Sequence, residues 1–254
     1  MFLKKYLLPG IILILFLGLA ASYSNSSNID DYSSVFQVST LNYLSEGNFG
    51  SNFSVGELKK YGNTGIGTFN GLDGEMIELN GIIYQIKSNG TIYRVNDSET
   101  VPYAMVLYFK PNKSIFINES MNYTQLMAFL NATVPSKNLV YCFKIMGTYD
   151  YIKARSPQEQ SQPYPNLTEA LKTQSIFNLE NVNGTMVGFW YPASASSLNL
   201  NDYHFHYIND GRNTGGHVVD LKLKSVIVEI SYISDIYMFY IQNNSYYNFN
   251  LKNT

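Results

Sequence analysis

The sequence has only one cysteine and lacks any concentration of basic residues beyond its first few positions. Its 254 residues carry a formal net charge of -2 at pH 7. Without a positive field to attract phosphates, nucleic acid is not expected as a partner. The single cysteine, Cys142, permits no intramolecular disulfide, and its apolar neighbours predict a buried small hydrophobe rather than a nucleophile. Stability must therefore come from a packed core, which a chain 45% apolar and 15% aromatic can supply.

Histidine is also scarce, and its placement is the most informative feature of the chain. The three histidines, His204, His206 and His217, fall in one short stretch. Aromatic and β-branched residues flank the Gly/Asn/Asp-rich segment 209–216, which predicts two strands joined by a loop. Side chains at i and i+2 project from one face of a strand, so His204 and His206 point together. The returning strand can bring His217 opposite them.

Three neutral imidazoles on one face favour a divalent transition metal, with zinc as the first choice. Three protein ligands leave a position open for water or substrate, which is the arrangement of a catalytic site. The simpler interpretation is a set of hydrogen-bonded histidines in an ordinary hairpin. The confinement of every histidine to this hairpin favours the metal site.

The first residues are organised like a targeting segment. Lys4 and Lys5 precede a largely apolar run over 6–21, and small residues follow it. This order predicts an export signal or an uncleaved membrane anchor over 1–22, and a Ser/Asn/Asp-rich linker over 23–34. We expect an exported protein, extracellular, periplasmic or held at the cell surface, that meets the membrane only through this segment.

The rest of the chain predicts an α+β fold made of two β-rich mixed-sheet units with a few short helices. Turn dipeptides such as Asn70-Gly71 and Asn80-Gly81 divide residues 65–95 into a β-meander. We place a domain boundary after residue 135. This gives an N-terminal mixed β domain over 35–135 and a C-terminal β domain over 136–254 that carries the metal site.

Individual elements are expected from capping patterns and from apolar runs. Helices are predicted at residues 55–61, from 122 to before 135, and from 166 to about 174. Strands are predicted at 103–109, at 139–155 with a possible break at Gly147, at 185–191, in the histidine hairpin and at 226–230.

Two further residues could take part in chemistry. The glycine-rich stretch 65–76 lacks the spacing of a phosphate-binding loop, but as a hairpin it would present Glu75 at the start of a strand. Arg155 ends a predicted strand, where its guanidinium could bind a substrate carboxylate through two parallel hydrogen bonds. Taken singly, each is more often a solvated or ion-paired surface residue.

Several segments together carry a resemblance to a known family. They are residues 36–41, 67–76, 147–149 with Arg155, 163–165, 188–189, and 203–206 through 215–220. In order and at similar spacing, over roughly residues 35–230, the chain resembles the acetolactate decarboxylase family.

That resemblance implies a zinc enzyme that converts 2-acetolactate to acetoin and carbon dioxide. It assigns His204, His206 and His217 as metal ligands, Glu75 as the active-site glutamate, Arg155 as the substrate arginine and Thr68 as a hairpin threonine. The hydroxyl and ketone oxygens of acetolactate could chelate the zinc, which would stabilise the enediolate left when carbon dioxide departs. The arginine would orient the substrate, and the glutamate would help to return a proton.

The C-terminal part departs from the family. The family has a further glutamate near its C-terminus that reaches the active site, whereas Asp235 is the only acidic residue here after Glu229. The terminal carboxylate of Thr254 is one candidate to replace it. The alternative function is a secreted non-catalytic metal-binding or surface module. A zinc hydratase of the carbonic anhydrase type is a weaker enzymatic rival, and a homodimer is the assembly considered.

Overall fold

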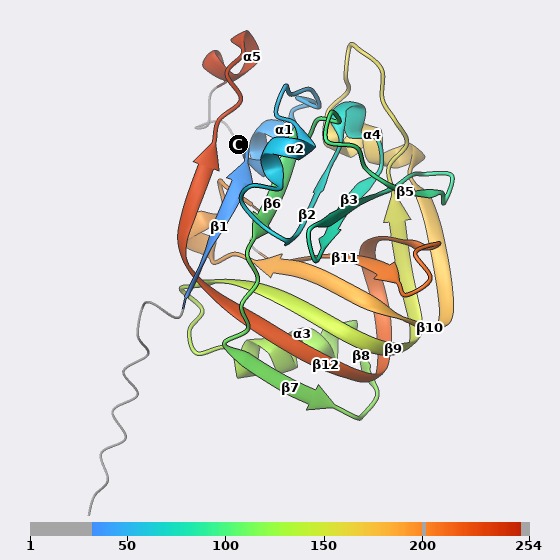
Figure 1. Cartoon of the computed structure of the whole chain (residues 1–254). Coiled ribbons are helices and arrows are strands. Elements are labelled where there is room, and N and C mark those ends of the chain that lie inside the picture. Colours follow the sequence, from blue (N-terminus) through green and yellow to red (C-terminus); the bar gives the residue numbers. More distant parts are fainter. Residues whose placement is uncertain (1–31, 200–201, 250–254) are drawn as a thin grey trace, which may run out of the picture.

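The computed structural model describes residues 32–199 and 202–249, so the predicted export segment over 1–22 lies outside the described residues. Within those two ranges, no helix is long and apolar enough to cross a membrane. The described chain is mostly β-sheet with a few short helices (Figure 1), and its strands form one 12-stranded mixed sheet. The expected α+β class is confirmed.

The first half of the chain supplies one end of the sheet. Residues 65–95 form the predicted meander, in which each strand pairs antiparallel with the next. Its strands are β2 (Thr64–Thr68), β3 (Glu75–Leu79), β4 (Ile82–Ile86) and β5 (Ile92–Arg94). Strand β6 (Tyr103–Leu107) pairs antiparallel with both β2 and β1 (Ser33–Val38).

The second half supplies four further strands of the sheet. They are β9 (Val140–Ser156), β10 (Ser175–Trp190), β11 (Tyr203–Asn209) and β12 (Gly215–Phe239). The strands predicted at 185–191 and 226–230 are only parts of β10 and β12. The possible break at Gly147 is wrong, because β9 continues through it. A Cβ on Gly147 would lie 2.2 Å from the Ser225 carbonyl oxygen, so the glycine lets β12 approach closely.

Strand β1 connects the two halves of the sheet, because it pairs parallel with β12 on one side and antiparallel with β6 on the other. It begins at Ser33, inside the segment predicted as linker. Two short strands, β7 (Lys113–Ile117) and β8 (Met121–Asn122), also pair with β12. The division of the chain into two domains after residue 135 stays a prediction.

The helices begin where the sequence places side-chain caps. The helices are α1 (Leu41–Ser45), α2 (Val55–Leu58), α3 (Tyr123–Thr133), α4 (Leu167–Ala170) and α5 (Asn244–Tyr247). Asn122 and Gln125 form the predicted capping box of α3. The helix predicted at 55–61 is shorter than expected, and the one predicted from 166 continues from α4 into a 3-10 turn, η3 (Leu171–Thr173).

The core consists of three apolar clusters. One lies among the long strands and α3, one draws on β1, β3, β4, β6 and α2, and the third joins residues from both halves of the chain. Cys142 is fully buried in this third cluster, as its apolar neighbours predict. Because the third cluster also contains Leu44 and Leu72, it forms the apolar support beneath the candidate site.

Candidate metal centre and active site

The histidine hairpin forms as predicted. His206 on β11 lies directly opposite His217 on β12, and His204 precedes His206 by two residues on the same strand face. The loop is closed by Asn209, whose Oδ1 accepts hydrogen bonds from the backbone N–H groups of Asn213 (2.9 Å) and Thr214 (3.2 Å). This hairpin places the three imidazoles together.

The imidazole nitrogens converge. One ring nitrogen from each histidine lies within 4.8 Å of the other two, and the Nε2 atoms of His204 and His206 are 3.1 Å apart. His206 Nδ1 donates to the Met76 carbonyl oxygen at 2.7 Å, which leaves the lone pair of its Nε2 directed at the cluster. Such a hydrogen bond on the remote nitrogen is typical of metal-binding histidines.

The electrostatics keep the rings neutral. Burial lowers the pKa of His206 to about 4, and burial lowers the pKa values of His204 and His217 well below the usual range. The nearby Arg155 guanidinium lowers them further. Neutral imidazole is the form that binds a metal, so this donor set fits a divalent transition metal.

A cavity of about 250 Å³ opens beside the histidines. Its polar lining includes His204, His217, Glu75, Arg155 and Thr68. The walls are largely apolar and include Leu41, Leu44, Leu72, Tyr103, Leu167 and Leu171. His206 lies behind this surface and is 1% exposed. The structure thus brings all six sequence-predicted site residues to one place, five of them at the cavity wall.

Glu75 begins β3 and is the one acidic residue among those that line the cavity in the described part of the chain. Its Oε2 lies 3.3 Å from His206 Nε2. Burial raises the pKa of Glu75 to about 7, and the charge of Arg155 opposes this shift. A carboxyl group with such a pKa can hold or release a proton near neutral pH.

Thr68 lies opposite Glu75 in the β2–β3 pairing. Its Oγ1 donates to the Gly74 carbonyl oxygen at 2.7 Å, across the turn that leads to Glu75. Gly74 adopts a φ of +81°, and a Cβ there would lie 2.3 Å from the Ile86 carbonyl oxygen. Only glycine therefore fits this turn.

Arg155 comes from β9 and lies opposite His217 in the β9–β12 pairing. Its Nη1 donates to Gln174 Oε1 at 3.0 Å, and its Nη2 lies 3.4 Å from His217 Nε2. Its buried Nε has no hydrogen-bond partner within the described residues. The guanidinium thus lies at the cavity without a carboxylate partner in that part of the chain, unlike a surface ion pair.

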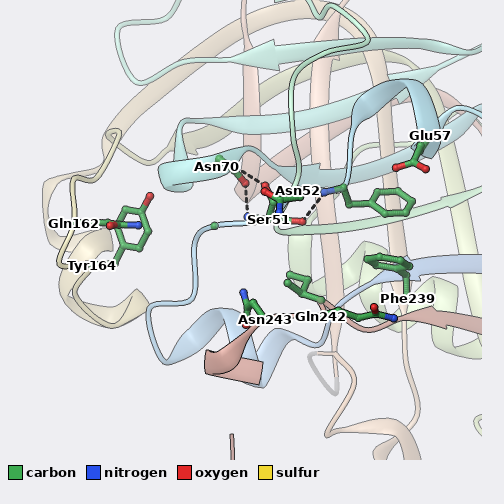
Figure 2. A pocket seen from close by; sticks show the side chains of 12 residues that line it. Ser51, Asn52, Glu57, Asn70, Gln162, Tyr164, Phe239, Gln242 and Asn243 are labelled. Atoms are coloured by element: carbon green, nitrogen blue, oxygen red, sulfur yellow. Dashed lines mark hydrogen bonds between the residues drawn. The ribbon is translucent and has the colours of Figure 1, made fainter. Parts of the chain in front are cut away.

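The turn between β2 and β3 is held on one side by amide hydrogen bonds. Asn70 Oδ1 accepts from the Ser51 backbone N–H at 2.9 Å, and Asn70 Nδ2 donates to the Ser51 carbonyl oxygen at 2.8 Å (Figure 2). A separate hollow of about 590 Å³ lies here, and its lining includes Asn52 and Gln162. The exchange of hydrogen bonds anchors the turn that precedes Glu75.

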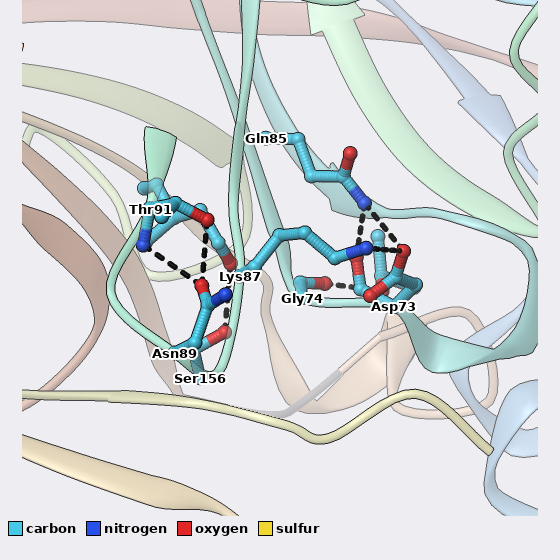
Figure 3. Close-up of polar contacts among 9 residues, drawn as sticks. Asp73, Gly74, Gln85, Lys87, Asn89, Thr91 and Ser156 are labelled. Carbon is cyan, nitrogen blue, oxygen red and sulfur yellow. Dashed lines mark hydrogen bonds and ion pairs between the residues drawn. The ribbon is translucent and has the colours of Figure 1, made fainter. Parts of the chain in front are cut away.

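The other side of the same turn is held by contacts to Asp73. Gln85 Nε2 donates to the Asp73 carbonyl oxygen at 2.6 Å, and Lys87 Nζ lies 2.8 Å from Asp73 Oδ2 (Figure 3). Ser156, next to Arg155, donates from Oγ to the Ile86 carbonyl oxygen at 2.7 Å. These contacts tie β4 to both the turn and the end of β9, so they fix Glu75 relative to the arginine.

Sequence reasoning missed these supporting groups. Gln174, which binds the guanidinium, and the Met76 carbonyl, which orients His206, had no recognisable signal. Met76 is nevertheless the residue after Glu75, so one strand supplies both a carboxyl group and the acceptor that orients a histidine.

A family model described as "Alpha-acetolactate decarboxylase" matches residues 35–253. The chain belongs to the alpha-acetolactate decarboxylase family. It is 42% identical over 199 residues to the alpha-acetolactate decarboxylase of Methanosarcina mazei. The aligned stretch covers 78% of this chain and 68% of the relative. Identity to the Bacillus subtilis alpha-acetolactate decarboxylase is 38% over 221 residues, 87% of each chain.

The solved structures of this family agree with the fold. The crystal structure of the Bacillus subtilis alpha-acetolactate decarboxylase superposes with a TM-score of 0.84 at 38% identity, and the match covers 86% of this chain and 94% of that one. A Staphylococcus aureus protein described as similar to alpha-acetolactate decarboxylase gives a TM-score of 0.83 at 28% identity over 87% and 96% of the two chains. Membership of a decarboxylase family makes the chain an enzyme, which disfavours the non-catalytic module.

Proposed function

We propose that the chain decarboxylates 2-acetolactate to acetoin and carbon dioxide at the cavity beside the histidine hairpin, with zinc as its metal. The observation that carries this proposal is the placement of Glu75 and Arg155 on the wall of the same cavity of about 250 Å³ as His204 and His217. The cavity thus brings together a cation that can bind a carboxylate, a carboxyl group of raised pKa and a metal-binding face. The family membership supports the reaction class.

His204, His206 and His217 would hold the metal, since their ring nitrogens converge and their pKa values are lowered. A zinc ion bound there would act as a Lewis acid on substrate oxygen atoms.

In this proposal Arg155 binds the substrate carboxylate. A guanidinium presents two parallel N–H groups to a carboxylate, and the apolar cavity walls strengthen that interaction by excluding water. The hydrogen bond from Nη1 to Gln174 fixes the plane of the group. The substrate is therefore held in one orientation, which is how a positioned cation contributes to rate.

Glu75 supplies a proton. When carbon dioxide leaves, the electron pair of the broken carbon–carbon bond stays with the substrate, and a proton must be added to the carbon that carried the carboxylate. A carboxyl group whose pKa is about 7 can act as that acid. Thr68 keeps the turn before Glu75 closed through its hydrogen bond to Gly74.

An assay of purified protein with 2-acetolactate tests the proposal. We expect acetoin and carbon dioxide to appear, a chelator to suppress both, and about one zinc per chain by metal analysis. A zinc hydratase would need neither Arg155 nor Glu75, so carbon dioxide hydration without acetolactate turnover would favour that rival. Production of acetoin that no chelator affects would contradict the metal assignment.

We further propose that the chain is exported, on the basis of Lys4, Lys5 and the apolar run over 6–21. Fractionation of native cells tests this, and full-length soluble protein in the cytoplasm would contradict it. The homodimer stays a prediction that light scattering of the purified chain can check.

A further inference from the structure

An exposed aromatic surface lies on three adjacent strands. Phe36 of β1 lies opposite Tyr237 of β12 and Val106 of β6, so these side chains face one side of the sheet. Tyr61 stacks on the ring of Phe36, with ring centroids 3.8 Å apart and planes 6° from parallel. Tyr108 lies just beyond the end of β6 and lines the same hollow as Phe36, Tyr61 and Tyr237. We call Phe36, Tyr61, Tyr108 and Tyr237 the tyrosine face.

The tyrosine face is accessible and flanked by lysines. Tyr61 is 44% exposed, Tyr108 is 59% exposed and Tyr237 is 60% exposed, and they line a hollow of about 830 Å³. Lys60 and Lys110 line the same hollow. Aromatic side chains gathered in this way indicate an interaction surface, whereas scattered ones do not.

The carboxylate of Asp235 lies near this surface. Asp235 pairs in register with Ser34 of β1 and lies two residues before Tyr237. Its Oδ2 accepts hydrogen bonds from Ser34 Oγ at 3.4 Å and from Ser234 Oγ at 2.8 Å. Because of this acid, the aromatic rings rather than net charge must supply most of any binding energy.

The chain enters the fold at this surface. Strand β1 begins at Ser33, and Tyr32 both lines the hollow and packs edge-on against Tyr232, with ring centroids 5.8 Å apart. In the sequence, residues 22–31 separate this point from the apolar run over 6–21. Such a segment spans at most roughly 35 Å when fully extended. Anything that holds the apolar run therefore keeps the tyrosine face close to it.

We propose that the apolar run is retained as an anchor in a phospholipid bilayer, and that the tyrosine face rests on the surface of that bilayer. Tyrosine rings favour the headgroup region because they combine an apolar ring with a polar hydroxyl group. Lysine side chains extend to lipid phosphates while their alkyl stems stay on the apolar surface. Tethering raises the effective concentration of the membrane surface to the millimolar range, so weak contacts suffice.

This orientation leaves the active site open. Phe36 and Val106 share a sheet face with Gly65 and Glu78, because these residues are directly opposite one another across β1, β6, β2 and β3. Glu75 is three residues from Glu78 on the same strand and so points to the other face. The cavity beside the histidines thus lies on the side of the sheet away from the bilayer. The inference does not depend on the decarboxylase proposal.

Tryptophan fluorescence of the full-length chain in vesicles tests the docking. The vesicles contain phosphatidylcholine and phosphatidylglycerol, with or without brominated acyl chains that quench nearby tryptophan. Tyr237→Trp is the reporter, and the matched control is Tyr93→Trp, on β5, where the tyrosine is 50% exposed. We expect quenching above the background of Trp190 to be about threefold stronger for Tyr237→Trp than for Tyr93→Trp. Tyr93 lies on the edge strand β5, five strands from β1, and the twist of the sheet turns that edge away from the bilayer.

Each other outcome overturns the proposal. Equal quenching at both positions, or none at Tyr237→Trp, would mean that the fold is tethered but not docked. A concentration-dependent emission shift of Tyr237→Trp that lipid does not alter would assign the face to a second copy of this chain. Soluble native protein whose mass shows cleavage near Ala21 would remove the anchor. Far-UV circular dichroism spectra that match the unsubstituted chain confirm that both variants fold, and neither residue lines the active-site cavity.

Charge reversal provides a second, independent measurement. Lys60→Glu in the Tyr237→Trp background should lower the quenching about twofold in vesicles rich in phosphatidylglycerol, because it places a negative charge beside lipid phosphates. Lys224→Glu is the matched control, since Lys224 is exposed on β12 but does not line the hollow. Equal effects of the two reversals would contradict the proposed contact.

Discussion

Strand β3 carries two buried glutamates in very different surroundings. Glu75 is 7% exposed and faces a cavity with His206 and Arg155 near it. Glu78 is 0% exposed, and neither of its carboxylate oxygens has a hydrogen-bond partner within the described residues. Burial raises the pKa of both to about 7. A raised pKa therefore does not identify a catalytic acid, and the groups that share its cavity must do so.

Among substitutions around Glu75, the largest loss of activity should come from a change in the metal site. We predict that His206→Ala removes most of the bound zinc and nearly all activity, because two imidazoles cannot fix the geometry of the site. Metal analysis and the acetolactate assay measure both. Glu78→Gln is the matched control and should keep its zinc. Undiminished zinc in His206→Ala would place the metal elsewhere and weaken the distinction between the surroundings of Glu75 and those of Glu78.

Glu75→Gln tests the proton-donor role directly. The amide keeps the size of the side chain but has no acidic proton, so we predict a loss of about 10²–10⁴ in kcat, the usual range for general acid catalysis, with zinc retained. Steady-state kinetics and chiral analysis of the acetoin check this. Glu78→Gln should leave kcat unchanged. Loss of zinc with Glu75→Gln would instead make the carboxylate a metal ligand, and full activity with unchanged chirality would rule out proton delivery by Glu75.

The family resemblance implies a second glutamate near the C-terminus, and this expected departure sharpens the prediction for Glu75. The last five residues lie outside the described part of the chain, and the side chain of Asp235 is bound to Ser34 and Ser234. Within the described ranges, the cavity has Glu75 as its one acidic side chain. Glu75 thus has no visible substitute there, which is why the predicted loss is large.

Arg155→Lys should have a smaller effect. Lysine keeps the charge but loses the planar pair of N–H groups, so we predict a cost of about 2–3 kcal/mol in kcat/KM, roughly 30- to 150-fold. The melting temperature should hardly change, because Arg155 makes no ion pair with a carboxylate in the described part of the chain. Lys153→Arg, two residues earlier on β9, is the matched control and should be neutral. An unstable Arg155→Lys variant with normal kinetics would show that the arginine is structural.

The histidine site could be predicted from the sequence because it depends on residues that are close together in the chain. The i, i+2 spacing of His204 and His206 determines the strand face that they share. The Asn/Gly-rich loop before His217 determines the returning strand, and the structure confirms this hairpin. Placing Glu75 and Arg155 beside them needed the family resemblance, since strand contacts between distant parts of the chain have no local signal. Gln174 was missed for the same reason.

The fold shows a similar limit. The short turns of the meander were predictable from residues such as Asn80 and Gly81, which adopt the positive φ values that such turns require. The full length of β12 was not, because its alternating and partly exposed pattern is supported by pairing with β1, β7, β8, β9 and β11 in turn. The sequence allowed a possible break of the strand at Gly147, but this glycine serves close packing.

Glu78 should show the smallest effect on activity and a clear effect on stability. Glu78 pairs with Gly65 and Ile83 on the neighbouring strands, and the nearby Lys59 is already bound to Asp97 at 2.6 Å. Because its folded-state pKa is about 7 and the ordinary pKa of a glutamate is 4.5, the folded protein binds more protons than the unfolded chain between these values. Stability must then fall as the pH rises from about 4.5 to 7 and stay low above that window.

Glu78→Gln removes this pH-dependent loss, which is on the order of 3 kcal/mol when ionisation is complete. We predict that the variant melts about 5–10 °C above the unsubstituted chain at pH 8. The difference should shrink or reverse at pH 5, where the wild-type carboxyl is protonated and the buried amide has no better partner. Glu57→Gln, an exposed position on α2, is the control and should show no such trend. A melting difference that stays constant from pH 5 to pH 8 would mean that Glu78 does not titrate in this window. The contrast between Glu78 and Glu75 would then rest only on the groups that surround each carboxyl.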